Sequence, residues 1–128
     1  MLREENGTWE NGVCYVSTVA IAIEDGLTDV VLRDGTTNVL DGAFQNHTTL
    51  KSVTIPASAV GGFTGVGSWG GAFDGCPNLT DLYFHGGNKV VYELFANDTP
   101  HAVNLHFDIL VQISGQEIML ISMQFLLG

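Results

Sequence analysis

Histidine and aspartate are the residue types of this chain best suited to catalysis or metal binding. The chain has four histidines, and two of them, His101 and His106, lie close in sequence to Asp108. Imidazole and carboxylate groups could bind a metal ion if these three side chains converged. His106 and Asp108 lie in a strand-like run, however, where we expect both to point outward from an edge strand. Because no G-x-S-x-G, H-E-x-x-H or paired-cysteine pattern accompanies the histidines, the sequence predicts no enzyme, no metal and no cofactor.

A glycine-rich segment is the second candidate for chemistry. Gly65–Gly70 reads G-V-G-S-W-G, which has the G-x-G-x-x-G spacing that binds a pyrophosphate in dinucleotide-binding proteins. That function needs a buried parallel strand before the motif, a long helix after it and an acidic residue for the ribose, and the sequence indicates none of them. We therefore interpret residues 61–71 as a surface loop. An exposed Trp69 would make it a binding loop, whereas a Trp69 packed on the domain would not.

A sequence repeat supplies the elements that must position any functional residue. Ala43–Ile55, AFQNHTTLKSVTI, returns as Ala72–Phe84, AFDGCPNLTDLYF, and Leu27–Leu32, LTDVVL, is a shorter copy. Each copy contains L-x-x-[VL]-x-[ILF], whose last two apolar residues fall on one side of a strand. The Ala-Phe pair should place a large ring at a bend, stacked on the ring of the next copy. Such units bury their apolar faces by packing on one another.

The residues between the apolar positions should form outward-facing columns across neighbouring copies. We predict a protein-contact face made of Asp29, Val31, Arg33, Ser52, Thr54, Asp81, Tyr83 and His85. A rigid strand face that carries an aromatic ring, an imidazole and carboxylates loses little conformational entropy on binding, and Tyr83 and His85 are the expected main contacts. The alternative is that all of these are ordinary solvated strand residues.

The segment Val39–Pro56, VLDGAFQNHTTLKSVTIP, resembles the repeat of BspA-type leucine-rich-repeat proteins, which occur on surface proteins of anaerobic bacteria and in some parasitic protozoa. In the second copy Cys76 stands where the family has its cysteine. The first copy has His47 there, and His85 stands where the family has proline. The resemblance implies a mainly β fold, a short, right-handed leucine-rich-repeat solenoid of about three to four coils.

The same resemblance implies a function and a location. It implies a cell-surface or secreted protein that binds a host or bacterial surface protein, in an adhesin-like role. The alternative is a structural spacer, a repeat segment of a larger surface protein with no partner of its own.

The 128 residues are long enough for one domain with a modest core. Residues 1–26 should form an N-terminal hairpin cap, with Asn11-Gly12 at its turn. Residues 27–107 hold the repeats, and residues 108–128 form a C-terminal cap or an assembly segment. Val103–Ile113 alternates like a strand, whereas residues 116–127 fit either a strand or a short helix. Because this end is apolar, we expect it to dock on the repeats or to form a homo-oligomer.

Charge restricts the partners. The chain has 14 acidic and 4 basic residues and a net charge of −10, which argues against binding to nucleic acid or an anionic membrane and favours a basic partner. No apolar run is long enough to span a membrane, and the first residues lack the apolar core of a signal peptide. Cys14 and Cys76 are expected to be buried packing residues without a redox role.

Overall fold

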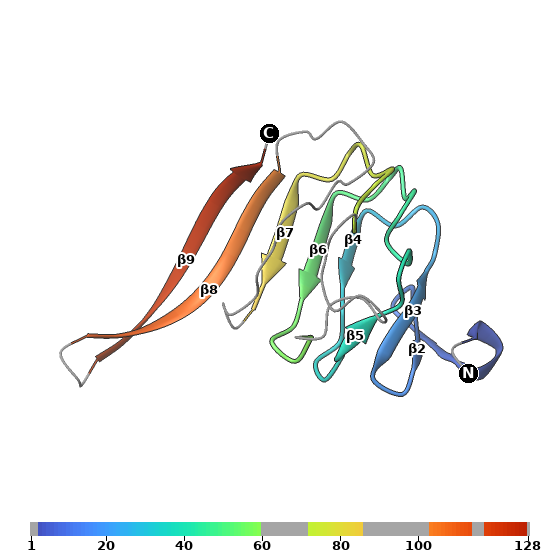
Figure 1. The fold of residues 1–128 in the computed structure, drawn as a ribbon, viewed down its shortest axis with the longest axis horizontal. Helices are drawn as coiled ribbons and strands as arrows, with labels where there is room; N and C mark the ends of the chain where they lie inside the picture. Colours follow the sequence, from blue (N-terminus) through green and yellow to red (C-terminus); the bar gives the residue numbers. More distant parts are fainter. Residues whose placement is uncertain (1–2, 60–71, 86–102, 114–116, 128) are drawn as a thin grey trace.

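The computed structural model describes residues 3–59, 72–85, 103–113 and 117–127 (Figure 1). The regular secondary structure of these residues consists of strands, joined by turns and irregular segments, and one short 3-10 helix, η1 (Glu4–Asn6). Two sheets result, which we call sheet A and sheet B. Sheet A has the strand order β1-β2-β3-β5 and sheet B the order β4-β6-β7-β8-β9. The mainly β prediction is confirmed for this part of the chain.

Sheet A contains β1 (Thr8–Glu10), β2 (Val13–Val16), β3 (Val19–Ile23) and β5 (Asn38–Val39). The first three strands pair antiparallel through tight turns, and β5 adds to β3 in parallel. Asn11 and Gly12 both have positive φ, 49° and 83°, as a type I′ hairpin turn requires. The N-terminal hairpin expected from the Asn-Gly pair is therefore confirmed.

Sheet B contains β4 (Asp29–Val31), β6 (Ser52–Ile55), β7 (Asp81–Phe84), β8 (Val103–Ile113) and β9 (Glu117–Leu127). The strands β4, β6, β7 and β8 are all parallel, and β9 returns antiparallel to β8. The copies of the repeat are aligned without a shift, because Val30 pairs with Val53 and Val53 with Leu82. The predicted strand at Val103–Ile113 is confirmed, and the open question about residues 116–127 is answered by strand β9.

The prediction of a leucine-rich-repeat solenoid is wrong. A solenoid is one continuous stack of coils, whereas these strands belong to two small sheets, and the described residues form no closed stack (Figure 1). The repeat pattern specified one strand and one bend per copy, and these local elements are present in the structure. It did not specify the flanking segments, where turns at Asn11-Gly12 and at Ser17 reverse the chain within two residues and produce antiparallel pairs.

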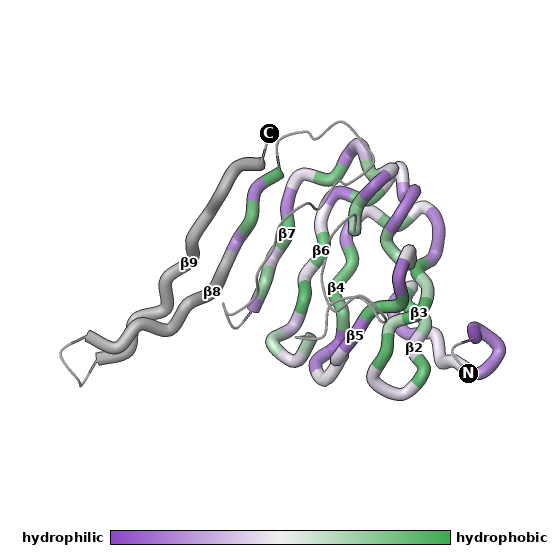
Figure 2. The backbone as a smooth tube through the Cα atoms, in the orientation of Figure 1, coloured by the Kyte–Doolittle hydropathy of each residue, from purple (hydrophilic) through white to green (hydrophobic). Residues whose placement is uncertain are grey.

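The core is built from the apolar positions of the repeat. Val30, Val53 and Leu82 are buried on the inner side of sheet B, and Figure 2 shows hydrophobic positions along the strands that carry them. Phe44 and Phe73 are fully buried and stack with ring centroids 5.2 Å apart and planes 10° apart, as the Ala-Phe pairs predicted. The inner side of sheet B therefore packs against the core, and the opposite side can carry polar residues. No helix among the described residues is long and apolar enough to cross a membrane.

Candidate functional site

The side of sheet B opposite the core carries two columns of aligned residues. The register of the parallel strands places Asp29, Ser52, Asp81 and Asn104 in one column and Val31, Thr54, Tyr83 and His106 in the other. We call these eight residues the outer face. The alignment predicted for the three copies of the repeat is confirmed, and β8 extends both columns by one residue.

The strand alternation sets which side chains reach this face. Along β4 and β7 the central apolar residue, Val30 or Leu82, is buried, and its neighbours point the other way. Val31 is 64% exposed and Tyr83 39% exposed, which is unusual for large apolar groups in this structure. The outer face thus presents an exposed valine and an exposed tyrosine in the column beside the one that carries the carboxylates.

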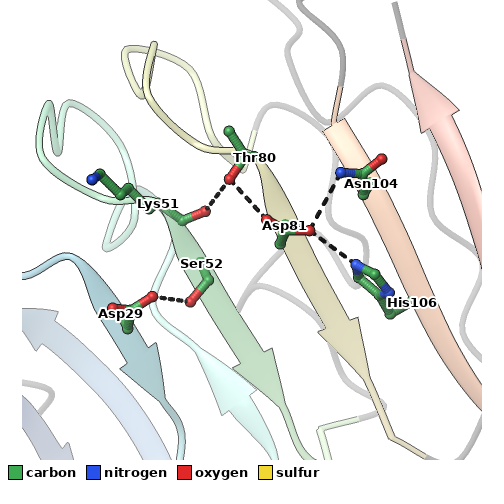
Figure 3. Close-up of polar contacts among 7 residues, drawn as sticks. All are labelled: Asp29, Lys51, Ser52, Thr80, Asp81, Asn104 and His106. Carbon is green, nitrogen blue, oxygen red and sulfur yellow. Dashed lines mark hydrogen bonds and ion pairs between the residues drawn. The ribbon is translucent and has the colours of Figure 1, made fainter.

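Asp81 is the centre of a hydrogen-bonded cluster on the outer face (Figure 3). Its Oδ1 accepts hydrogen bonds from Nε2 of His106 at 3.0 Å and from Nδ2 of Asn104 at 3.4 Å, and its Oδ2 accepts one from Oγ1 of Thr80 at 2.8 Å. The hydrogen bond from His106 is the largest cause that lowers the pKa of Asp81 from its ordinary 3.8, and partial burial opposes it. Asp81 is therefore an ionised carboxylate at neutral pH, and Nε2 of His106 must carry the proton between the two groups.

The second carboxylate of the face is fixed in a similar way. Ser52 Oγ donates a short hydrogen bond to Oδ1 of Asp29 (Figure 3). Thr28 Oγ1 donates to Oδ2 of Asp29 at 3.1 Å. The bond from Ser52 is the main cause that lowers the pKa of Asp29. Two negative charges thus stand at fixed positions in one column.

Tyr83 and His106 form an aromatic platform in the other column. Their rings stack with centroids 4.4 Å apart and planes 13° apart. His106 is held from one side by this stack and from another by Asp81, and its side chain is only 20% exposed. The platform therefore leaves Tyr83 accessible in a fixed orientation.

His106 is the functional residue whose place the sequence reasoning missed. The sequence allows a metal ligand together with His101 and Asp108, but it favours a side chain that points outward from an edge strand. In the structure β8 is an interior strand between β7 and β9, and His106 pairs in register with Tyr83. His101 lies outside the described residues, and no group of three metal-binding side chains occurs among the described ones. The signal for His106 was its position between Leu105 and Phe107 in the alternating run Val103–Ile113.

Two members of the predicted contact set lie at the margins of the face. Arg33 follows β4, and its guanidinium packs 4.0 Å from the centre of the Tyr15 ring and donates to Glu10 at 3.0 Å. It therefore links sheet A to the end of β4 rather than joining Tyr83. His85 follows β7, is exposed, and donates its backbone N–H to the Ile55 carbonyl at 3.0 Å.

The hydrogen bond between Asp81 and His106 fixes the orientation of the His106 ring. Carboxylate–imidazole pairs orient general bases in hydrolases, but there the second ring nitrogen faces a hydroxyl or thiol. Here Tyr83 contacts the plane of the His106 ring, which is stacking geometry. Cys14 and Cys76 are both buried as predicted, and burial is the main cause that raises the pKa of the Cys14 thiol. The glycine-rich segment 61–71 with Trp69 lies outside the described residues.

Comparison with known proteins gives no match to any family model, to any curated protein or to any solved structure. Nothing in these comparisons identifies the chain as a BspA-type leucine-rich-repeat protein, so that resemblance stays a prediction.

Proposed function

We propose that this chain is a non-catalytic protein-binding module and that its outer face binds a protein partner. The observation that carries this proposal is the Tyr83–His106 stack, held in place by the ionised Asp81. An exposed aromatic residue that is already fixed in one rotamer loses little side-chain entropy when a partner covers it. Tyrosine is also among the residue types that dominate binding energy at protein interfaces.

The charge pattern favours a partner with a basic surface. Asp29 and Asp81 are ionised at neutral pH, and the whole chain carries a net charge of −10. Opposite charge on the partner would raise the association rate and fix the orientation of the two surfaces. Val31 and Tyr83, in the column beside the carboxylates, would supply the apolar contact that charge alone does not give.

A structural spacer is the alternative function. Single exposed apolar residues are common on monomeric proteins, and surface hydrogen bonds such as those of Asp81 also form where nothing binds. A spacer would present other parts of a longer protein and would have no partner to lose when the outer face is changed.

Our proposal includes a cell-surface or secreted location, which the family resemblance supports, and self-association through the C-terminal segment 108–128. Six of the eleven β8–β9 residue pairs lie beyond Phe107, the last residue of β8 that pairs with β7. In the described residues this end of the hairpin is a two-stranded ribbon, an arrangement that is only marginally stable alone and whose edges favour added strands.

Comparative capture tests the proposed function. The wild-type chain, Tyr83→Ala, Asp81→Ala and the control Asp41→Ala, an exposed residue outside the outer face, are immobilised and exposed to proteins of the source organism and its surroundings. We expect a protein that wild type and the control retain and that both outer-face variants lose by at least about tenfold, the range of an interface main contact. Identical protein sets on all four would refute binding by the outer face and favour the spacer.

A further inference from the structure

A cleft lies where sheet A meets the edge of the outer face. Its volume is about 310 Å³, and it is lined by Glu10, Asn11, Tyr15, Asp29, Val31 and Arg33. Glu10, Asn11 and Tyr15 belong to the β1–β2 hairpin. Asp29 and Val31 belong to β4, and Arg33 is the second residue after it. The volume is at the lower end of the range for small-molecule sites, which suits a single side chain of a partner.

On one wall of the cleft, the charge of Arg33 is paired with that of Glu10, and several contacts hold the Arg33 side chain in place. Arg33 donates from Nη1 to Glu10 at 3.0 Å and from Nη2 to the Ser17 carbonyl at 2.8 Å, and its guanidinium lies 4.0 Å from the centre of the Tyr15 ring. Its backbone N–H donates to the Tyr15 hydroxyl at 3.0 Å. The positive charge of Arg33 is thus paired with the negative charge of Glu10 and is held in place from several directions.

The other wall carries the negative charge of Asp29 beside an apolar group. Asp29 accepts hydrogen bonds from Ser52 and Thr28, and the positive charge of Lys51 also favours its ionised form, but no ion pair joins Asp29 to Arg33 among the contacts of the described residues. Next to it in β4, two residues on, Val31 is 64% exposed. Counting Glu10, Asp29 and Arg33, the cleft has a formal net charge of −1.

We infer that this cleft accepts a lysine side chain of the partner, with the ammonium group at Asp29 and the aliphatic stem on Val31. This inference rests on the proposed function, because Asp29 and Val31 belong to the outer face. Lysine combines a cation with four methylene groups, which matches a carboxylate beside an exposed valine. An anionic side chain would meet Asp29 and an Arg33 that is already paired with Glu10.

Titration with a lysine analogue tests the inference. The probe is Nα-acetyl-lysine-N′-methylamide, the neutral control is the norleucine analogue, and the anionic control is the glutamate analogue, all at constant ionic strength. Chemical shifts of the Val31 methyl groups report binding. We expect saturable shifts with the lysine analogue at millimolar Kd, the range of such a small ligand, and none with the norleucine analogue.

Two variants that each remove one negative charge distinguish binding in the cleft from a general effect of the net charge of the chain. Asp29→Asn keeps an oxygen that can accept from Ser52 and should weaken binding of the lysine analogue about two- to fivefold, as loss of an exposed ion pair does. Asp41→Asn, outside the cleft, should leave binding unchanged. Amide spectra that match the wild type outside the cleft confirm that both variants are folded.

Three results would overturn the inference: no saturation, equal weakening by both variants, or preferential binding of the glutamate analogue. Because the capture comparison depends on Tyr83 and Asp81, a partner lost by those variants together with a failed titration would refute only the lysine cleft. Failure of the capture comparison with a successful titration would refute only the outer face as the main contact surface.

Discussion

Replacement of Asp81 by alanine tests whether the outer face is held in one arrangement by its own hydrogen bonds. The carboxylate accepts from His106, Asn104 and Thr80, and its side chain is 29% exposed. A typical hydrogen bond contributes about 0.5–1.5 kcal/mol, and water replaces part of that at a partly exposed site. The 3.4 Å bond from Asn104 is the weakest of the three. We therefore expect Asp81→Ala to lower the free energy of unfolding by about 1–2 kcal/mol at pH 7.

The same variant has a predicted pH dependence with a definite sign. The pKa of Asp81 is lower in the folded chain than its ordinary 3.8, so its ionised form stabilises the fold. That contribution is complete above the unfolded-state pKa and is lost as the pH falls through the lower folded-state pKa. The difference in stability between wild type and Asp81→Ala should therefore shrink as the pH falls below 3.8.

Urea unfolding followed by circular dichroism at pH 7, 5 and 3 measures both effects. The control is Asp34→Ala, which removes the same charge at an exposed turn and should change stability by less than about 0.5 kcal/mol. The reasoning is refuted if Asp81→Ala is as stable as the control variant at pH 7. It is also refuted if the loss at pH 7 persists unchanged at pH 3, since the loss would then not depend on the carboxylate charge.

Three further predictions concern the parts of the fold that position the outer face. Phe44→Ala should lower the free energy of unfolding in urea by about 3–5 kcal/mol, because it removes one ring of the fully buried Phe44–Phe73 stack. A loss as small as that of a substitution at an exposed residue would contradict this packing. Gly12→Ala should lower the free energy of unfolding by about 1–3 kcal/mol, because Gly12 has φ +83° and an added Cβ would lie 2.7 Å from Leu27 Cδ1. An unchanged thermal unfolding temperature would contradict this turn geometry. Deletion of 117–128 should cause aggregation in light scattering because it exposes a new edge on β8, whereas a monomer with an unchanged melting temperature would contradict the role of β9.

The local parts of this fold could be predicted because each depends on a short pattern. The repeat fixed which residues are buried, and a pair such as Val53 and Leu82 aligns because a shift of one residue would turn the apolar side chains away from the core. Asn11-Gly12 specified its turn by itself, since few residue pairs accept positive φ at both positions.

The overall architecture could not be predicted in the same way. Whether repeats stack into one solenoid or form two sheets depends on how the segments before and after them pair, and no repeat pattern covers those segments. The reversal after β8 that adds β9 antiparallel is one case, and the hairpins of sheet A are the other.

The sequence predicted which residues share a column of the outer face, but it did not predict the contacts between their side chains. Strand register alone places Asp81 and Tyr83 on the outer face. The ring of His106 reaches both of them because β8 pairs with β7, and about twenty residues of sequence separate these two strands. Arg33 was expected on the face, but the antiparallel hairpin of sheet A supplies Glu10 and Tyr15, which hold it at the margin.

Site-specific photo-crosslinking tests the central claim, that the outer face is a protein-contact surface, most directly. A benzophenone amino acid is introduced at position 83, where Tyr83 is exposed, and separately at position 41, where exposed Asp41 lies outside the outer face. The proteins are irradiated in the presence of proteins of the source organism and its surroundings. The account predicts a discrete adduct from position 83 that is absent from position 41 and is reduced when Asp81→Ala is added. The same adducts from both positions, or none from position 83, would contradict it.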